Sequence, residues 1–146
     1  MNFMNAIDTN VLVYWADSDG GNKRKIAVEL LQRLPQAPQR TVLLWQVAVE
    51  FLNCMRRLER TGRITREETV GYLQKLEDTY DYALPTIPVI HVALDLTARY
   101  SLSHWDSLLV AACIEAGVTT LYSEDMADGA DYDGVRIVNP FREMVA

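Results

Sequence analysis

The sequence is poor in cysteine, in histidine and in positive charge. Its 146 residues include two cysteines and two histidines, and 14 basic residues stand against 20 acidic ones. Because Cys54 and Cys113 both lie within apolar helical patterns, we interpret them as reduced core thiols, which argues against a disulfide framework or a cysteine-based zinc site. The net charge of −6 argues against a protein that coats nucleic acid through bulk positive potential, but it permits a local contact.

Long apolar runs are also missing, and no segment approaches the length of a membrane span. The first residues lack the basic flank of a signal peptide, and Asp8 interrupts them before an apolar core of sufficient length forms. The apolar and charged fractions, 49% and 23%, are typical of a globular domain. We therefore predict a single cytoplasmic domain over residues 1–146, without contact with a membrane.

Apolar segments with strand character alternate along the chain with segments of helical periodicity. Strands are expected in the segment that ends at Asp8 and at residues 41–45, 84–90, 118–122 and 135–138. Helices are expected at residues 9–15, 22–34, 46–58, 65–80, 91–100 and 107–116. Such alternation favours parallel strands joined by right-handed crossovers, so we predict a three-layer α/β/α sandwich with a central, mainly parallel sheet.

Local signals support several of these helices. Thr65 and Glu68 have the spacing of a capping box, and Gly62 and Gly117 follow helical segments as C-terminal caps. The helix at 107–116 carries almost no charge, which predicts that it is buried. On the helix at 65–80 we assign three apolar residues to the core rather than to an interface: Val70, Leu73 and Leu76.

Four acidic residues stand at positions that need a physical reason. Asp8 and Asp125 follow predicted strands, at the edge where α/β sheets place ligands. Glu50 and Asp106 interrupt segments with few other charges, where an ionised side chain is unfavourable unless it is paired. Neighbouring carboxylates without a counter-ion repel one another, and a divalent cation is the simplest remedy. Donors that are all oxygen favour Mg²⁺ or Mn²⁺ over zinc.

Each of these acids also has an alternative interpretation. Asp8, Asp106 and Asp125 each come before a predicted or possible helical segment and match the residue types that cap helix N-termini. Glu50 matches a half-buried acid paired with an arginine of another helix. The sequence alone leaves these alternatives open for each acid taken singly.

Five segments carry a resemblance to a known family. They are Asp8-Thr9-Asn10, Gln46 to Phe51, Trp105 to Leu109, Ser123 to Met126, and Gly134 to Phe141. In order and approximate spacing, the first four resemble the acidic signature of PIN-domain ribonucleases, and the last resembles their closing strand. Over essentially its whole length, the chain is most similar to the VapC-type toxins of bacterial toxin–antitoxin pairs.

The resemblance implies a site, a cofactor, a reaction and partners. The metal-binding and catalytic acids would be Asp8, Glu50, Asp106 and Asp125, with support from Asn10 and Ser123. The cofactor would be Mg²⁺ or Mn²⁺, and water activated at the metal site would attack phosphorus of RNA without a side-chain nucleophile. The partners would be an RNA substrate, a cognate antitoxin protein that blocks the acidic cleft, and a second copy of the chain in a homodimer. Glu124 and Asp128 lie close enough in sequence to replace or assist Asp125.

Binding of RNA requires positive charge beside the acids. Arg56, Arg57 and Arg60 follow Glu50 on the same predicted helix, and we expect them to contact phosphate groups. A solvated helix face is the alternative interpretation of these arginines.

Three other classes of protein share parts of this pattern. A haloacid-dehalogenase-type phosphatase has a second aspartate where this chain has Asn10. A receiver domain has paired acids before the strand and a late lysine, whereas no lysine follows Lys75. A catalytically inactive PIN-like module that binds RNA or protein would keep the same fold, and the presence of all four acids weighs against it.

Overall fold

The protein is built on one six-stranded sheet. The structure, a computed structural model, describes residues 3–142. The strands lie in the order β3-β2-β1-β4-β6-β5, with the bounds Met4–Ile7 (β1), Arg40–Leu44 (β2), Asp81–Ala83 (β3), Thr120–Tyr122 (β4), Asp131–Tyr132 (β5) and Val135–Val138 (β6). Neighbouring strands are parallel, except that β5 and β6 are antiparallel.

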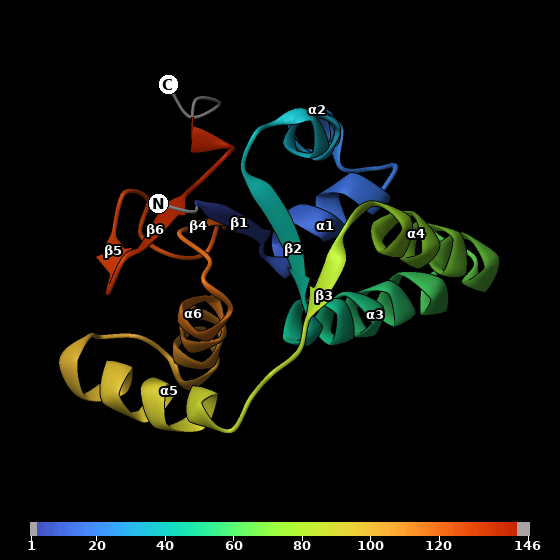
Figure 1. The fold of residues 1–146 in the computed structure, drawn as a ribbon. Coiled ribbons are helices and arrows are strands. Elements are labelled where there is room, and N and C mark those ends of the chain that lie inside the picture. The colour runs from blue at the N-terminus through green and yellow to red at the C-terminus, as the bar shows by residue number, and fades with distance from the viewer. Residues whose placement is uncertain (1–2, 143–146) are drawn as a thin grey trace.

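Helices cover both faces of this sheet. Their bounds are Thr9–Ala16 (α1), Gly21–Arg33 (α2), Trp45–Arg60 (α3), Arg66–Thr79 (α4), Pro88–Arg99 (α5) and His104–Ala116 (α6), and a 3₁₀ turn spans Leu34–Gln36 (η1). Helices α1 to α4 lie on one side of the sheet, and α5 and α6 lie on the other (Figure 1). This is the three-layer α/β/α sandwich that the sequence predicts. Across residues 3–142, no helix combines the length and the apolar character that crossing a bilayer requires.

Buried aliphatic and aromatic side chains fill the space between the sheet and its helical layers. In the central strand β1, three successive residues are buried. Helices cover both faces of the sheet, so the residues of this strand do not alternate between buried and exposed. Helix α3 contributes Phe51 and Met55 to the core, and α6 contributes Val110 and Cys113, all with no exposed surface. The prediction that the uncharged helix is buried is therefore confirmed.

The predicted helix ends are confirmed in detail. The Thr65 hydroxyl accepts a hydrogen bond from the Glu68 N–H at 3.1 Å, and the Glu68 carboxylate accepts one from the Thr65 N–H at 3.1 Å. Gly117 closes α6 with φ at 82°, in the left-handed region that favours glycine. The local sequence therefore accounts for these helix ends without reference to tertiary contacts.

The predicted strand at residues 84–90 is wrong. The strand β3 is shorter and earlier, and α5 begins at Pro88, within the stretch assigned to the strand. Proline favours the first turn of a helix because its fixed φ suits that position and its missing N–H would have no partner there. The β-branched residues around Pro88 therefore belong to a helix start.

The short strand β5 was not predicted from the sequence. It pairs with β6 through a tight hairpin whose central residues, Asp133 and Gly134, have φ values of 53° and 96°. Two successive positive φ values match the two-residue hairpin turn that Asp-Gly favours. The Asp-Gly dipeptide was the signal that could have revealed this strand.

The three apolar residues of α4 divide between the core and the surface. Leu76 is buried in the core, as predicted, and Leu73 is half-buried. Val70 is 53% exposed, so its assignment to the core is wrong. The surface of α4 therefore presents one large apolar side chain to solvent or to a partner.

Candidate active site

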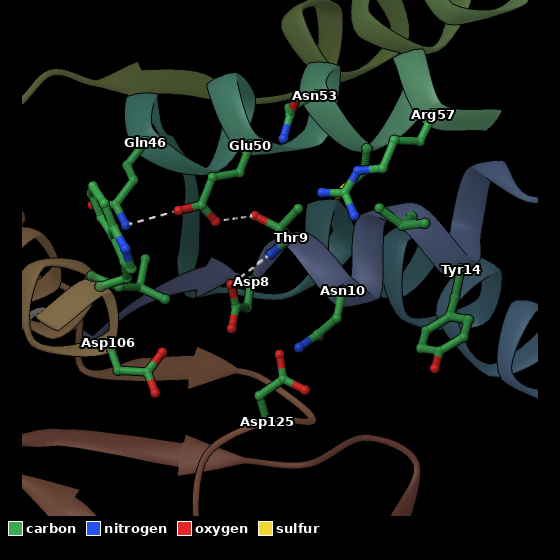
Figure 2. A pocket seen from close by; sticks show the side chains of 14 residues that line it. Asp8, Thr9, Asn10, Tyr14, Gln46, Glu50, Asn53, Arg57, Asp106 and Asp125 are labelled. Carbon is green, nitrogen blue, oxygen red and sulfur yellow. Dashed lines mark hydrogen bonds between the residues drawn. The ribbon is translucent and has the colours of Figure 1, made fainter. Parts of the chain in front are cut away.

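The carboxyl edge of the sheet brings distant segments together. Asp8 directly follows β1, and Asp125 lies in the loop after β4, which is the parallel neighbour of β1. Helix α3 begins directly after β2, and α6 runs back toward the start of β4, so the first turns of both helices stand at the same edge. All four predicted acids, Asp8, Glu50, Asp106 and Asp125, line one cavity of about 470 Å³ (Figure 2).

Asp8 is the most buried of these acids, with 6% of its surface exposed. One carboxylate oxygen accepts a hydrogen bond from the Thr9 N–H at 2.7 Å, and the other accepts one from the Ser123 hydroxyl at 2.7 Å. Burial raises the pKa of Asp8 to about 6; the hydrogen bonds from Ser123 and Thr9 lower this pKa, and the negative charges of Asp125 and Glu50 raise it. Asp8 does cap α1, so the capping interpretation is correct and coexists with a place in the cavity.

Glu50 is held by neutral donors. Its carboxylate accepts hydrogen bonds from the Thr9 hydroxyl at 3.0 Å and from the Gln46 side-chain amide at 3.1 Å (Figure 2). Within residues 3–142, Glu50 makes no ion pair with lysine or arginine, so the alternative of a paired acid is wrong. Thr9 serves two acids at once, because its N–H faces Asp8 and its hydroxyl faces Glu50.

The capping alternative is wrong for Asp106 and for Asp125. The N-cap of α6 is Ser103, whose hydroxyl accepts a hydrogen bond from the Asp106 N–H at 3.1 Å. Asp106 therefore sits in the first turn of α6, where its carboxylate is free to point into the cavity. Asp125 is exposed, and the next regular element after it is the strand β5 rather than a helix.

The two supporting residues occupy different places. Asn10 lines the cavity, and its side-chain oxygen accepts a hydrogen bond from the Glu124 N–H at 3.4 Å. Its buried side-chain nitrogen has no hydrogen-bond partner in the part of the chain that the structure describes. Ser123 is fully buried and does not line the cavity, but its hydroxyl donates a hydrogen bond to Asp8 and accepts one from the Asp125 N–H at 3.3 Å.

The two further acids considered as substitutes for Asp125 are engaged elsewhere. Glu124 forms an ion pair with Lys23 at 2.5 Å and accepts a hydrogen bond from the Tyr14 hydroxyl at 3.0 Å. Asp128 accepts a hydrogen bond from the Asn139 N–H at 2.7 Å, and this bond, with an ion pair to Arg142, lowers its pKa below the usual range. Neither acid lines the cavity.

Of the three arginines expected to bind RNA, one reaches the cavity. Arg57 is among the lining residues, whereas Arg56 and Arg60 are exposed on α3 outside the lining. Helical spacing explains the difference. Residues three, four and seven positions after Glu50 share its face of the helix, and these positions hold Asn53, Cys54 and Arg57.

Other lining residues were not predicted from the sequence. They are Thr9, Val13, Tyr14, Gln46, Asn53, Cys54, Trp105 and Leu109. The residues of α3 were predictable from the spacing to Glu50, and Trp105 from its place beside Asp106. Cys54 is half-buried in this lining, so the prediction that it is a core thiol is wrong, whereas Cys113 is buried as predicted.

The lining has the chemistry of a site for a hard cation. None of the four acids makes an ion pair within residues 3–142, and Arg57 is the one basic residue among those lining the cavity. Oxygen donors with excess negative charge suit Mg²⁺ or Mn²⁺. In the same described range, however, no three acidic, histidine or cysteine side chains stand close enough together to hold a metal ion. The cavity therefore presents suitable atoms at separations wider than a ligand shell.

Three solved structures with the same fold are described as toxins or as toxin–antitoxin complexes. VapC20 of Mycobacterium tuberculosis, described as a toxin that cleaves the sarcin–ricin loop, is 16% identical with a TM-score of 0.63, over 83% of this chain and 89% of that one. A toxin–antitoxin complex from Klebsiella pneumoniae is 19% identical with a TM-score of 0.63, over 93% and 97%. VapBC2 of Rickettsia felis, bound to a DNA fragment from its promoter, is 12% identical with a TM-score of 0.65, over 92% and 97%.

Sequence comparison identifies the family independently of these structures. No curated protein matches the sequence of the chain. The model of the PIN domain matches residues 6–127, which include all four acids of the cavity and most of the chain. The chain belongs to the PIN domain family.

Proposed function

We propose that the protein is a metal-dependent endoribonuclease that hydrolyses phosphodiester bonds of RNA, and that it is the toxin of a toxin–antitoxin pair. The observation that carries this proposal is the meeting of Asp8, Glu50, Asp106 and Asp125 in one cavity without ion-pair partners among the described residues. Membership of the PIN domain family supports it, as does the fold shared with toxins, one of which is described as cleaving the sarcin–ricin loop.

The four acids would hold Mg²⁺ or Mn²⁺ partly through water, which such ions retain and which would span the wide separations between the carboxylates, with Asn10 and Ser123 in support. A bound divalent cation lowers the pKa of water and stabilises the charge that develops on phosphate oxygens. The other residues of the site orient these acids. Ser123 and the Thr9 N–H fix the carboxylate plane of Asp8, and Gln46 and the Thr9 hydroxyl fix that of Glu50.

The side chains of the cavity favour water as the nucleophile. Burial raises the pKa of the Cys54 thiol, which keeps it protonated and weakly nucleophilic at neutral pH. The Thr9 hydroxyl donates its hydrogen to Glu50, and the Tyr14 hydroxyl donates its hydrogen to Glu124. His91 and His104 are exposed and do not line the cavity. The proposed role of Arg57 is to contact a phosphate of the RNA from the α3 side.

The proposal includes protein partners and a single folded unit over residues 1–146. An antitoxin partner is supported by the two structural neighbours that are themselves toxin–antitoxin assemblies.

A homodimer is supported by an apolar face at the start of α5, which consists of Leu84, Ile87, Ile90 and Leu94, between 65% and 79% exposed. Because residues 82–94 include no Asp, Glu, Lys or Arg, a second copy can pair with this face without repulsion between like charges.

The first prediction concerns Asp8. Asp8→Asn removes one negative oxygen donor but keeps the shape of the side chain, so we expect cleavage of single-stranded and loop-containing RNA with Mg²⁺ or Mn²⁺ to fall by about 100-fold or more. Asp78→Asn is the matched control, since Asp78 is exposed on α4 and lies outside the cavity. Cleavage that survives Asp8→Asn would refute the metal site. Wild-type protein that binds RNA but never cleaves it would favour the inactive binding module.

The second prediction concerns stability without metal. Because burial raises the pKa of Asp8 from 3.8 to about 6, ionisation of this group lowers the free energy of unfolding by about 3 kcal/mol above pH 6. In EDTA at pH 7.5, Asp8→Asn is therefore expected to have a larger free energy of unfolding than wild type. The difference should vanish below about pH 4, where Asp8 is protonated in both the folded and the unfolded state. Urea titrations at several pH values measure it, and a variant less stable throughout would contradict this account.

The third prediction separates the arginines of α3. Arg57→Ala is expected to weaken RNA binding and to lower the slope of log affinity against log salt concentration by about 1, because one phosphate contact is lost. Arg56→Ala, which removes the same charge outside the cavity lining, is the control and should change the slope less. Fluorescence anisotropy with labelled RNA in an Asp8→Asn background measures both. Equal slopes for the two variants would remove Arg57 from the RNA interface.

The fourth prediction concerns the apolar face of α5. Leu94→Glu places a charge on the apolar face that we assign to a second copy, so the molar mass in solution should fall from that of a dimer to that of a monomer. Val70→Glu is the control, because Val70 is an exposed apolar residue on α4, away from this face. Light scattering coupled to size-exclusion chromatography gives the mass. A mass that Leu94→Glu leaves unchanged would place the dimer contact elsewhere or show that the protein is a monomer.

A further inference from the structure

The mouth of the cavity carries a large exposed aromatic side chain. Trp105 precedes Asp106 in the first turn of α6, lines the same cavity and is 64% exposed. In the described part of the chain, its ring pairs only with that of His104, edge to face, with centroids 4.7 Å apart. Trp15, by contrast, is half-buried and packs against Phe51 and Tyr72. Core packing therefore accounts for Trp15 but not for the position of Trp105.

The charge of the protein limits how it can hold RNA. The chain has a net charge of −6, and the cavity offers one arginine beside four acids. Affinity for RNA that comes from phosphate contacts requires several basic side chains acting together. A site with so little positive charge needs a contribution that does not depend on charge, and stacking of a base on an aromatic ring provides one.

The geometry points to Trp105 as a stacking platform for an unpaired base of the RNA, next to the phosphodiester bond that is hydrolysed beside the acids. This inference rests on the proposed function and names the part of the substrate that the site selects. Every base has a face that can stack on an indole ring, but a base inside a duplex already stacks on its neighbours. The expected consequence is a preference for single-stranded segments or loops at the site, with little dependence on which base is present.

Stacking and phosphate contact respond differently to salt. Loss of a stacking residue lowers the affinity at every salt concentration and leaves the salt slope unchanged, whereas loss of a phosphate contact lowers the slope. A structural role of Trp105 would alter the melting temperature and would weaken binding to single strands and duplexes alike. The salt slope and the comparison between strand types therefore distinguish a stacking role from the other two.

The test uses the full chain in an Asp8→Asn background with Mg²⁺, so that binding is measured without cleavage. Trp105→Leu keeps apolar volume but removes the aromatic face, and Trp105→Phe keeps a smaller one. Trp45→Leu is the matched control, because Trp45 is 48% exposed but lies outside the cavity lining. Anisotropy is recorded with a labelled single-stranded RNA of mixed sequence and with its duplex, at several salt concentrations.

We expect Trp105→Leu to weaken binding of the single strand by about tenfold, with an unchanged salt slope, an unchanged melting temperature and no effect on the duplex. Trp105→Phe should lose less affinity than Trp105→Leu, and Trp45→Leu should bind as the background protein does. Equal binding by Trp105→Leu and the background protein, or an equal loss on single strand and duplex, would overturn the stacking role. A background protein that binds neither RNA would instead contradict the proposed function.

Discussion

The main constraint on this structure is the repulsion among four carboxylates that meet at the carboxyl edge of the parallel sheet. Keeping these groups ionised there is unfavourable unless a cation is present. The backbone brings Asp8 and Asp125 together because β1 and β4 are parallel neighbours, and the helices that begin at this edge add Glu50 and Asp106. Burial and the charges of nearby acids raise the pKa of Asp8 to about 6. A fold selected for stability alone would not gather these groups without a counter-ion, so the arrangement is understandable as a site that binds a cation.

Neutral donors make this arrangement tolerable. Thr9 lies between two acids, and its N–H donates to Asp8 while its hydroxyl donates to Glu50. Ser123 donates to the other oxygen of Asp8, and Gln46 donates to the other oxygen of Glu50. A lysine or arginine in these positions would neutralise the acids more strongly, but it would also compete with a metal ion for the same oxygens. Neutral hydrogen bonds orient the carboxylates and leave their charge available.

The sequence predicted the parts of the site that depend on charge in an apolar setting, and missed the parts that depend on helical geometry. Glu50 and Asp106 stand out because few charges surround them, whereas Asn53 and Cys54 become part of the lining only through their spacing along α3. The strand predicted at residues 84–90 was wrong for a different reason. The β-branched residues there suggest a strand, but Pro88 begins a helix. The three layers of the fold were predictable because strands and helices alternate along the sequence. This alternation can be recognised without knowing where side chains lie in space.

The charge distribution links the cavity to its proposed substrate. Four carboxylates and one arginine leave the lining strongly negative, so a phosphate group meets repulsion there until a divalent cation cancels part of that charge. On the proposed function, cation and RNA would therefore assist each other's binding, because the cation reduces the repulsion between the acids and the phosphate groups. The remaining affinity must come from contacts that are indifferent to charge, and among the lining residues Trp105 has the largest exposed aromatic surface available for them. On this view, the net negative charge of the protein prevents RNA from binding over a broad surface. Binding would be confined to the cavity, where a cation offsets the charge of the acids.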